Sequence, residues 1–501
     1  MNTLLPLVVY VIATRAQGHG WPLGLAEDPI QDFIDQTLNM KAFFEDQRVK
    51  VEKAFNSSYE EAIKMKESVT NYVDEQQKKI SADINNYVES VKESGRKAVD
   101  SWSYLPIEEP GAKMEVPDMF LSVPAVIVRN DYYCETHTVL SQGYILNVHR
   151  IARSKSFGDI PKRTVLLQHG LFGSSADWVL NGPDKALGYV LADAGYDVWM
   201  SNVRGNRYSK EHILYKSTSK TFWNFSWHDV ALHDIPAVID HILKIKGDCS
   251  ITYIGHSMGT TILFAMLTLR PEYNNILKAA LALAPVAFLT DLKSPIKSLT
   301  PIASNVAYME MLYGSHEFLP KDSVLGRMTS SCKVDNVDTI MCKNVIFYIC
   351  GSNEKQFNKL LLPVFLANLG TGTSWKTAVH FAQEVVAGGK FQQFDYGPKD
   401  NQRVYGADTP PEYDLSKITL PIKLFWAEND LLSSETDVRL LYEKLPASKQ
   451  IYKVPDPKFS HLDYLWAVDA PTLVNEEVLA FTFFSPLYLN DHIDPSDFIR
   501  V

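Results

Sequence analysis

The sequence predicts an α/β fold in which a mostly parallel central sheet is wrapped by helices. Two observations lead to this prediction. From about residue 124, short apolar runs alternate with helical patterns, which is typical of parallel strands joined by helices. Apolar residues make up 46% of the 501 residues and charged residues 22%, so the composition is that of a globular rather than a disordered chain. The length suffices for one large domain with insertions, or for two domains.

The first residues are typical of a secretory signal peptide. Residues 4–13 are apolar but too few to span a bilayer, and small residues follow at Ala16 and Gly18. We therefore predict a signal peptide over residues 1–18 and a secreted protein, the alternative being a buried N-terminal strand. No later apolar stretch is long enough for a transmembrane segment, so none is expected.

Residues 19–110 predict a helical N-terminal extension. Proline is absent between Pro29 and Pro106, and apolar residues recur at helical spacing over this stretch. The clearest part of that spacing is formed by Val51, Phe55, Tyr59 and Ile63. Two interpretations are open: a solvated helical hairpin packed on the main domain, or, within residues 20–105, a surface for a lipid particle or a protein partner.

The core of the α/β fold is predicted over residues 120–285 and 396–490. Each part contains apolar runs typical of buried strands, with helical patterns between them. These runs are residues 164–168, 195–200, 250–254, 278–284, 422–427 and 449–454. Residues 286–395 interrupt the strand order and are rich in helix formers, so we predict that they form a cap and lid over the site.

Residues 255–259, Gly-His-Ser-Met-Gly, provide the strongest chemical signal. They fit G-x-S-x-G between a predicted strand and a predicted helix, which is the context of the nucleophile elbow in the α/β-hydrolase fold. The flanking glycines avoid clashes in the sharp turn, and the following helix N-terminus places N–H groups near a developing anion. We predict that Ser257 is the nucleophile and that His256 packs in or orients the turn.

A serine hydroxyl needs a base, and in this fold an acid and then a histidine follow the serine, each after a late strand. Asp430 follows the predicted strand 422–427, and His461 follows the predicted strand 449–454. We predict that His461 is the general base and that Asp430 orients it. The competing acids are Glu428, Asp437 and Asp456, and the competing histidines are His169, His316, His380 and His492.

In this fold an oxyanion hole takes one main-chain N–H from the loop after the first buried strand and one from the residue after the nucleophile. These positions are Leu171 and Met258, which we predict as the two donors. The sequence has no H-E-x-x-H, no paired zinc spacing of cysteines, and no G-x-G-x-x-G opening a helix after the first strand. We therefore predict no metal and no cofactor.

Charge and cysteine content limit the partners and the chemistry further. The net charge of −10 argues against a nucleic-acid partner, because phosphate binding requires a basic face. Five cysteines leave at least one without an intramolecular partner. Cys332 and Cys342 would close a short loop, and we favour a disulfide between them. Asn56 and Asn224 stand in N-x-S sequences and are predicted glycosylation sites.

Six further stretches match one family in order: residues 142–146, 167–171, 178–183, 191–199, 202–206 and 461–466. On these stretches the chain resembles the acid lipases, the gastric and lysosomal lipases with their arthropod relatives, over about residues 120 to 485. The resemblance implies a secreted hydrolase of triacylglycerols or cholesteryl esters, with a mobile lid over a hydrophobic pocket. The triad and the cap disulfide of that family map onto the residues predicted above, and its free cysteine onto Cys350.

The chain also departs from this family. Met258 stands where the vertebrate enzymes have glutamine, but the donor is the amide, so activity is expected to survive. Residues 20–105 have no counterpart, and only two glycan acceptors are present, so plain secretion is expected rather than sorting to lysosomes. A second hypothesis is a lipid-binding or storage protein with a hydrolase fold and little turnover. The presence of all three triad residues favours the lipase.

Overall fold

The computed structural model describes residues 121–153, 163–247, 250–300, 316–318, 346–358, 361–368, 372–446 and 449–484. The predicted signal peptide and N-terminal extension lie outside the described residues, as do Asn56, Cys249, Cys332, Cys342 and His492. The chain divides into two units, and every element named below belongs to the larger one, residues 116–334 and 349–501.

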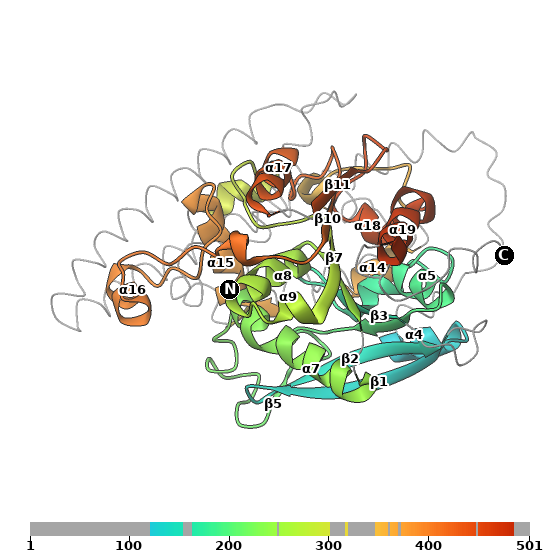
Figure 1. The fold of residues 1–501 in the computed structure, drawn as a ribbon, viewed down its shortest axis with the longest axis horizontal. Helices are drawn as coiled ribbons and strands as arrows, with labels where there is room; N and C mark the ends of the chain where they lie inside the picture. Colours follow the sequence, from blue (N-terminus) through green and yellow to red (C-terminus); the bar gives the residue numbers. More distant parts are fainter. Residues whose placement is uncertain are drawn as a thin grey trace, which may run out of the picture. The chain divides into compact units, whose positions relative to one another are not determined.

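Nine strands of the described chain form one mixed sheet in the order β1-β2-β4-β3-β6-β7-β10-β11, with β5 paired to β2 (Figure 1). Neighbours from β4 to β11 are parallel, whereas β1, β2 and β5 pair antiparallel. The strands are β1 (Tyr133–Ser141), β2 (Tyr144–Arg153), β3 (Thr164–Gln168), β4 (Asp197–Met200), β5 (Glu211–His212), β6 (Ile251–His256), β7 (Leu277–Leu283), β10 (Ile422–Trp426) and β11 (Lys449–Lys453). A separate antiparallel pair joins β8 (Glu317–Phe318) to β9 (Thr373–Ser374).

Helices cover both faces of the sheet. Figure 1 shows α7, α8 and α17 on one side of it and α5 and α19 on the other. The α-helices are α4 (Val123–Arg129), α5 (Leu187–Asp193), α6 (Trp227–Asp229), α7 (Ile235–Lys246), α8 (Met258–Leu269), α9 (Tyr273–Ile276), α14 (Leu362–Asn368), α15 (Trp375–Ala387), α16 (Pro398–Tyr405), α17 (Glu435–Lys444), α18 (Asp463–Trp466) and α19 (Glu476–Phe484). No helix of the described ranges is both long enough and apolar enough to cross a membrane.

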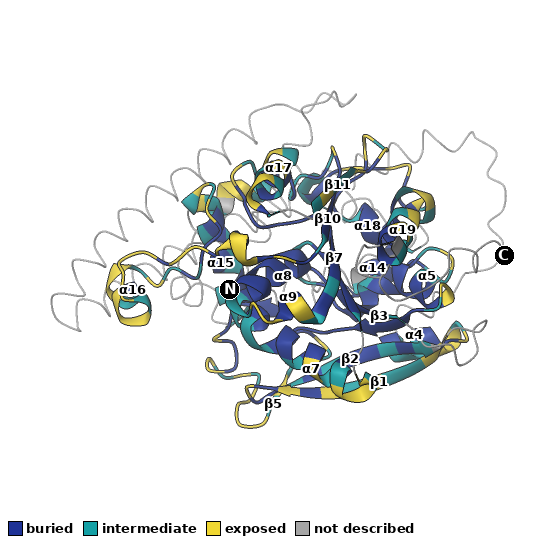
Figure 2. Cartoon of the chain, viewed as in Figure 1, coloured by how far each residue is buried: buried dark blue, intermediate teal, exposed yellow. Residues whose placement is uncertain are grey.

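Because helices cover both faces of the sheet, the central strands consist mainly of apolar residues. Every residue of β3, β4, β6 and β10 is buried (Figure 2). Strands buried on both faces are expected to be nearly continuous apolar runs, as these are. The helix α8 is apolar almost all round and is buried from Met258 to Thr268, because it lies beneath other elements rather than at the surface.

The α/β prediction with a mostly parallel sheet is confirmed, and the six predicted strands are present to within two residues at either end. The antiparallel pair of β1 and β2 was not predicted from the residue pattern. Much of β1 is only partly buried, so it contains no continuous apolar run that would indicate a strand. Within the predicted cap, residues 286–395, the described elements include α14, α15, β8 and β9.

Candidate active site

The turn between β6 and α8 holds Ser257 in an unusual conformation. β6 ends at His256, α8 begins at Met258, and Ser257 between them has φ 53° and ψ −121°. A non-glycine residue rarely adopts a positive φ, and such strain is characteristic of functional sites. Ser257 therefore lies in a sharp turn at the carboxyl edge of the sheet, where its hydroxyl no longer belongs to the strand.

Both glycines of the motif are required by contacts in the turn. A Cβ atom at Gly259 would overlap the main-chain carbonyl oxygen of Gln168, the last residue of β3. A Cβ atom at Gly255 would lie 2.8 Å from the main chain of Gly259. The strand and the helix can approach this closely only because neither position carries a side chain.

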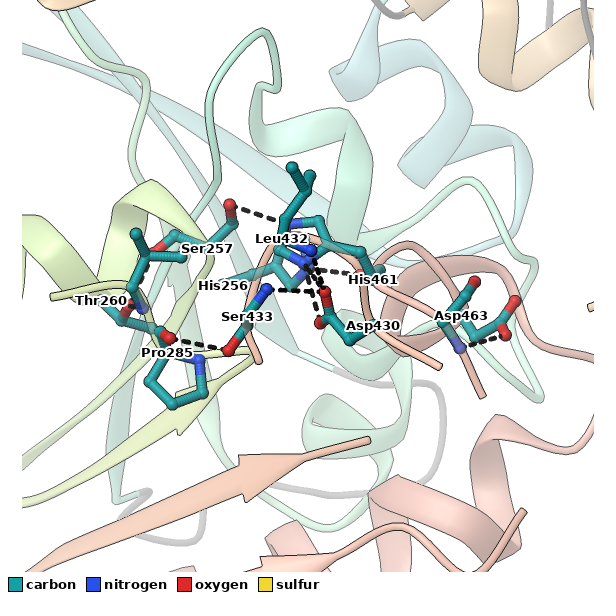
Figure 3. Close-up of polar contacts among 11 residues, drawn as sticks. His256, Ser257, Thr260, Pro285, Asp430, Leu432, Ser433, His461 and Asp463 are labelled. Atoms are coloured by element: carbon teal, nitrogen blue, oxygen red, sulfur yellow. Dashed lines mark hydrogen bonds and ion pairs between the residues drawn. The ribbon is translucent and has the colours of Figure 1, made fainter. Parts of the chain in front are cut away.

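His461 lies between Ser257 and Asp430, as Figure 3 shows. Its Nε2 atom is 2.8 Å from Oγ of Ser257. Its Nδ1 atom is 2.9 Å and 3.0 Å from the two carboxylate oxygens of Asp430. A carboxylate only accepts hydrogen bonds, so Nδ1 carries the proton and Nε2 is left as the acceptor for the serine hydroxyl. This is the tautomer in which an imidazole can remove a proton from a serine.

Asp430 is held by its own loop after β10. Its carboxylate is buried and accepts hydrogen bonds from the main-chain N–H groups of Leu432 (2.9 Å) and Ser433 (2.8 Å). The hydroxyl of Ser433 donates to the carbonyl of Pro285 at the end of β7 (2.7 Å). These bonds hold the carboxylate in one orientation, because the two loop amides bind one of its oxygens while both oxygens face Nδ1 of His461.

The loop of His461 is fixed through its main chain. The N–H of His461 donates to the carbonyl of Cys350 (3.2 Å), and the carbonyl of His461 accepts from Nε2 of His256 (2.8 Å). Burial lowers the pKa of His256 to about 3, so this ring is neutral and donates only through Nε2. His256 therefore connects the nucleophile turn directly to the loop that carries the base.

The competing acids lie elsewhere. Glu428 is exposed and forms an ion pair with Lys453 (2.7 Å). Asp437 lies on α17 and accepts from the main-chain N–H groups of residues 290 and 291. Asp456 accepts from the side chains of Asn353 and Gln356.

His169 and His380, two of the competing histidines, form their hydrogen bonds with other groups than Ser257. The ring of His380 is buried in the predicted cap, where it stacks on Trp227 with centroids 3.9 Å apart. His169 is occupied with the loop that follows β3. Nδ1 of His169 donates to the carbonyl of Gly170 (2.8 Å), and Nε2 accepts from the N–H of Val203 (3.2 Å).

Of the two predicted oxyanion donors, Met258 directly follows the serine in the chain, and Leu171 follows a glycine that lies against it. Met258 is the first residue of α8, so its N–H has no partner within the helix. Leu171 follows Gly170, where a Cβ atom would lie 3.0 Å from Cβ of Ser257. Within the described residues, neither the N–H of Leu171 nor that of Met258 donates a hydrogen bond, which leaves both for a ligand oxygen.

A polar network beneath the Leu171 loop was not predicted. Burial lowers the pKa of His169 to about 4, so it remains neutral, and its Nε2 also contacts the side-chain amide of Asn206 (3.3 Å). Asn206 in turn donates to the side chain of Asn202 (3.0 Å), which accepts from the N–H of Ser175 (3.0 Å). His169, Asn202 and Asn206 fall within two of the stretches that carry the family resemblance, which was the available signal.

Of the remaining predicted glycosylation and cysteine positions, the structure describes Asn224, Cys134 and Cys350. Asn224 is exposed between buried aromatic neighbours, so its side chain is accessible. Cys134 and Cys350 are free thiols, and burial raises the pKa of the Cys350 thiol above its usual range. No group of histidine, cysteine and acidic side chains suited to a metal ion occurs in the described part of the chain.

Comparison with known proteins assigns the chain to a fold class and a family. The family description "alpha/beta hydrolase fold" matches residues 163–468, which places the chain in that class, and "partial alpha/beta-hydrolase lipase region" matches residues 123–182. The gastric triacylglycerol lipase of Bos taurus is 39% identical over 73% of this chain and 91% of its own length. Lipase 3 of Drosophila melanogaster is 40% identical over 70% of this chain and 89% of its own length.

A solved structure of a putative lipase from Acinetobacter baumannii covers 76% of this chain and 99% of its own, with 14% identity and a TM-score of 0.41. From the sequence relatives, the chain belongs to the acid lipase family that includes the gastric triacylglycerol lipases. The protein is a carboxylic ester hydrolase of the lipase type. The predicted family and enzyme class are confirmed.

Proposed function

We propose that this chain is a secreted lipase that hydrolyses the esters of neutral lipids, triacylglycerols or cholesteryl esters, through Ser257, His461 and Asp430. The observation that carries the proposal is the 2.8 Å approach of the His461 Nε2 atom to the Ser257 hydroxyl, with Nδ1 held by the Asp430 carboxylate. Nucleophile, base and orienting acid within hydrogen-bond reach are the requirement for acyl transfer by a serine.

The reaction begins when Ser257 Oγ attacks the ester carbonyl carbon and His461 Nε2 takes the serine proton. The imidazolium that forms is stabilised by the Asp430 carboxylate. As the tetrahedral intermediate collapses, the imidazolium gives its proton to the alcohol that leaves, and the acyl group stays on the serine. Water, deprotonated by His461, then releases the fatty acid and restores the serine.

The negative charge of each tetrahedral intermediate would be stabilised by the N–H groups of Leu171 and Met258. Both amides lie beside the nucleophile and donate to no group of the described chain. One such donor contributes about 3 kcal/mol to transition-state stabilisation. The dipole of α8, which begins at Met258, acts in the same direction.

The substrate class is supported by the relatives and by the surroundings of Leu171. Relatives of similar sequence are gastric triacylglycerol lipases. The next residue, Phe172, packs against Phe318 of β8 with centroids 5.4 Å apart, and Phe318 packs against Trp375 (4.4 Å). This aromatic row beside the oxyanion donors is suited to an acyl chain. Secretion is supported by the apolar residues 4–13 at the start of the chain.

The test is Ser257→Ala in the full chain, assayed on emulsified triolein, cholesteryl oleate and a soluble p-nitrophenyl ester. We expect hydrolysis of all of them to fall by about 10⁴-fold or more, with an unchanged melting temperature. The matched control is Ser416→Ala, which removes an exposed hydroxyl and should leave turnover unchanged. Turnover of the esters by Ser257→Ala at the wild-type rate would refute the proposed nucleophile.

A further inference from the structure

The turn that follows β5 exposes three consecutive apolar side chains. The exposed fractions are 59% for Ile213, 76% for Leu214 and 41% for Tyr215. A single exposed apolar residue needs no explanation, but several together at one point of a surface mark a site of interaction. Figure 2 shows the segment around β5 in the colour of exposed residues.

This turn is built to hold its shape although its apolar side chains are in solvent. Nδ1 of His212 accepts from the N–H groups of Leu214 (2.9 Å) and Tyr215 (3.1 Å), so the proton of the ring is on Nε2, which donates to the carbonyl of Gln142 (3.1 Å). The ring also stacks on Tyr215 with centroids 4.4 Å apart. An ordered backbone that presents apolar side chains loses little further entropy when they bind.

The turn lies at the same edge of the sheet as the candidate active site. β2 runs antiparallel to β4, and its His149 is opposite Met200, the last residue of β4. β2 begins at Tyr144, five residues before His149, and Tyr144 pairs with His212 of β5. At the usual rise per residue, β5 therefore lies about 17 Å beyond the carboxyl end of β4. Ser257 follows the carboxyl end of β6, which is separated from β4 only by β3.

A chain of contacts connects this turn to the oxyanion loop. The ammonium group of Lys210, which directly precedes β5, forms an ion pair with Glu317 of β8 (2.7 Å). The neighbour of Glu317 on β8, Phe318, packs against Phe172, the residue after Leu171. These contacts link the turn, through β8, to the loop that carries Leu171.

We propose that Ile213, Leu214 and Tyr215 form a lipid anchor that inserts into the surface of the substrate particle. Exposure of three consecutive apolar side chains in one turn favours a lipid surface, because such a surface can receive all three together. The charge of the sequence around the anchor agrees: residues 207–220 contain Arg207, Lys210, Lys216 and Lys220 against the single acid Glu211, in a chain of net charge −10, although Lys210 is paired with Glu317. Apolar and aromatic side chains bordered by lysine and arginine are typical of segments that bind at the lipid–water interface.

This inference rests on the proposed function, and its test separates the two. The full-chain double variant Ile213→Ser with Leu214→Ser is compared with wild type for flotation with phosphatidylcholine vesicles that contain triolein, with and without phosphatidylserine. Hydrolysis of emulsified triolein and of soluble p-nitrophenyl butyrate is measured in parallel. Since burial of each apolar side chain contributes about a decade of affinity, we expect loss of the two side chains to lower vesicle affinity and triolein hydrolysis about 100-fold. Hydrolysis of the soluble ester should stay within about twofold of wild type.

The matched control is the double variant Val128→Ser with Ile245→Ser. These side chains are exposed by 59% and 42%, and they lie at the ends of α4 and α7, at the opposite edge of the sheet. Their replacement should leave flotation unchanged.

An equal loss in the control, or wild-type flotation of the Ile213/Leu214 variant, would overturn the proposal. So would sedimentation showing a wild-type dimer that the variant converts to a monomer, because the occupant would then be a second copy. A wild-type chain that floats but cleaves neither ester would refute the proposed function and leave the anchor standing.

Discussion

The centre of the sheet and its β1 edge place their side chains in different environments. In β3 every residue is buried, because helices cover both faces, whereas in β1 several side chains are exposed or only partly buried. The parallel half carries Ser257, Asp430 and His461 on loops fixed by buried hydrogen bonds. The antiparallel half carries the exposed anchor of residues 213–215. Close packing therefore holds the candidate catalytic residues in place. The less closely packed edge of the sheet leaves the apolar side chains of residues 213–215 exposed.

The largest expected effect concerns the chemistry of the buried half. In Asp430→Asn the side-chain oxygen still accepts from the loop amides, but the orientation of His461 in the required tautomer is lost. We expect kcat to fall about 10⁴-fold while the melting temperature changes little. Steady-state kinetics on a soluble ester measure this. The neighbouring exposed acid gives the control, since Glu428→Gln should leave kcat within about twofold. A similar loss in both variants would show that the hydrogen bond of Asp430 is not the cause.

The second prediction tests how tightly the buried half is packed. Gly259→Ala brings a Cβ atom onto the carbonyl of Gln168, which is backbone and has no room to move. We expect the free energy of unfolding to fall by about 3–5 kcal/mol, or no folded protein. Gly406→Ala is the control, because Gly406 has φ 72° but open space around it, so only about 1 kcal/mol of conformational strain is expected. Urea unfolding of both variants gives the comparison.

A third prediction compares the two halves directly by the same substitution. Leu166→Ala in β3 removes a fully buried side chain and should cost about 3 kcal/mol, whereas Leu140→Ala in β1, which is 60% exposed, should cost about 0.5 kcal/mol or less. Chemical denaturation measures both values. Equal costs would mean that the edge hairpin is packed as tightly as the centre.

The smallest effect concerns pH. Burial lowers the pKa of His256 to about 3, below the ordinary histidine value, so the unfolded chain binds more protons than the folded one between these values. Stability contributed by neutral His256 is therefore present above about pH 6.5 and is lost as pH falls toward 3. His256→Gln keeps a donor for the carbonyl of His461 but does not titrate. We expect the melting temperature of wild type to fall more steeply than that of the variant below pH 6.5, by a few degrees. Parallel curves would contradict this.

Raised carboxyl pKa values act in the opposite direction to the buried histidines. Burial raises the pKa of Asp463, two residues after His461, to about 7, so its protonation favours the folded chain as pH falls below 7. For this reason the effect of His256 is measured as the difference in melting temperature between wild type and His256→Gln at each pH. The pH profile of the wild type alone would combine both effects.

The sequence by itself determined the parallel strands and predicted the three residues that we propose as the triad. Strands buried on both faces must be continuous apolar runs, and a nucleophile turn must have glycines at both flanks, so both leave a local pattern. Asp430 and His461 were predicted from chain order, because loops after parallel strands meet at one edge of the sheet. These features follow from physical rules that act over a few residues or through topology alone.

Only the tertiary structure decided the contacts that no local pattern encodes. The bond from His256 to the carbonyl of His461 joins residues 205 positions apart, and β5 pairs with β2 although it is only two residues long. The exposure of Ile213 and Leu214 also could not be predicted, because an apolar residue in a turn is buried or exposed according to what packs over it. Burial is a property of the assembled surface, and the sequence specifies it only through the whole fold.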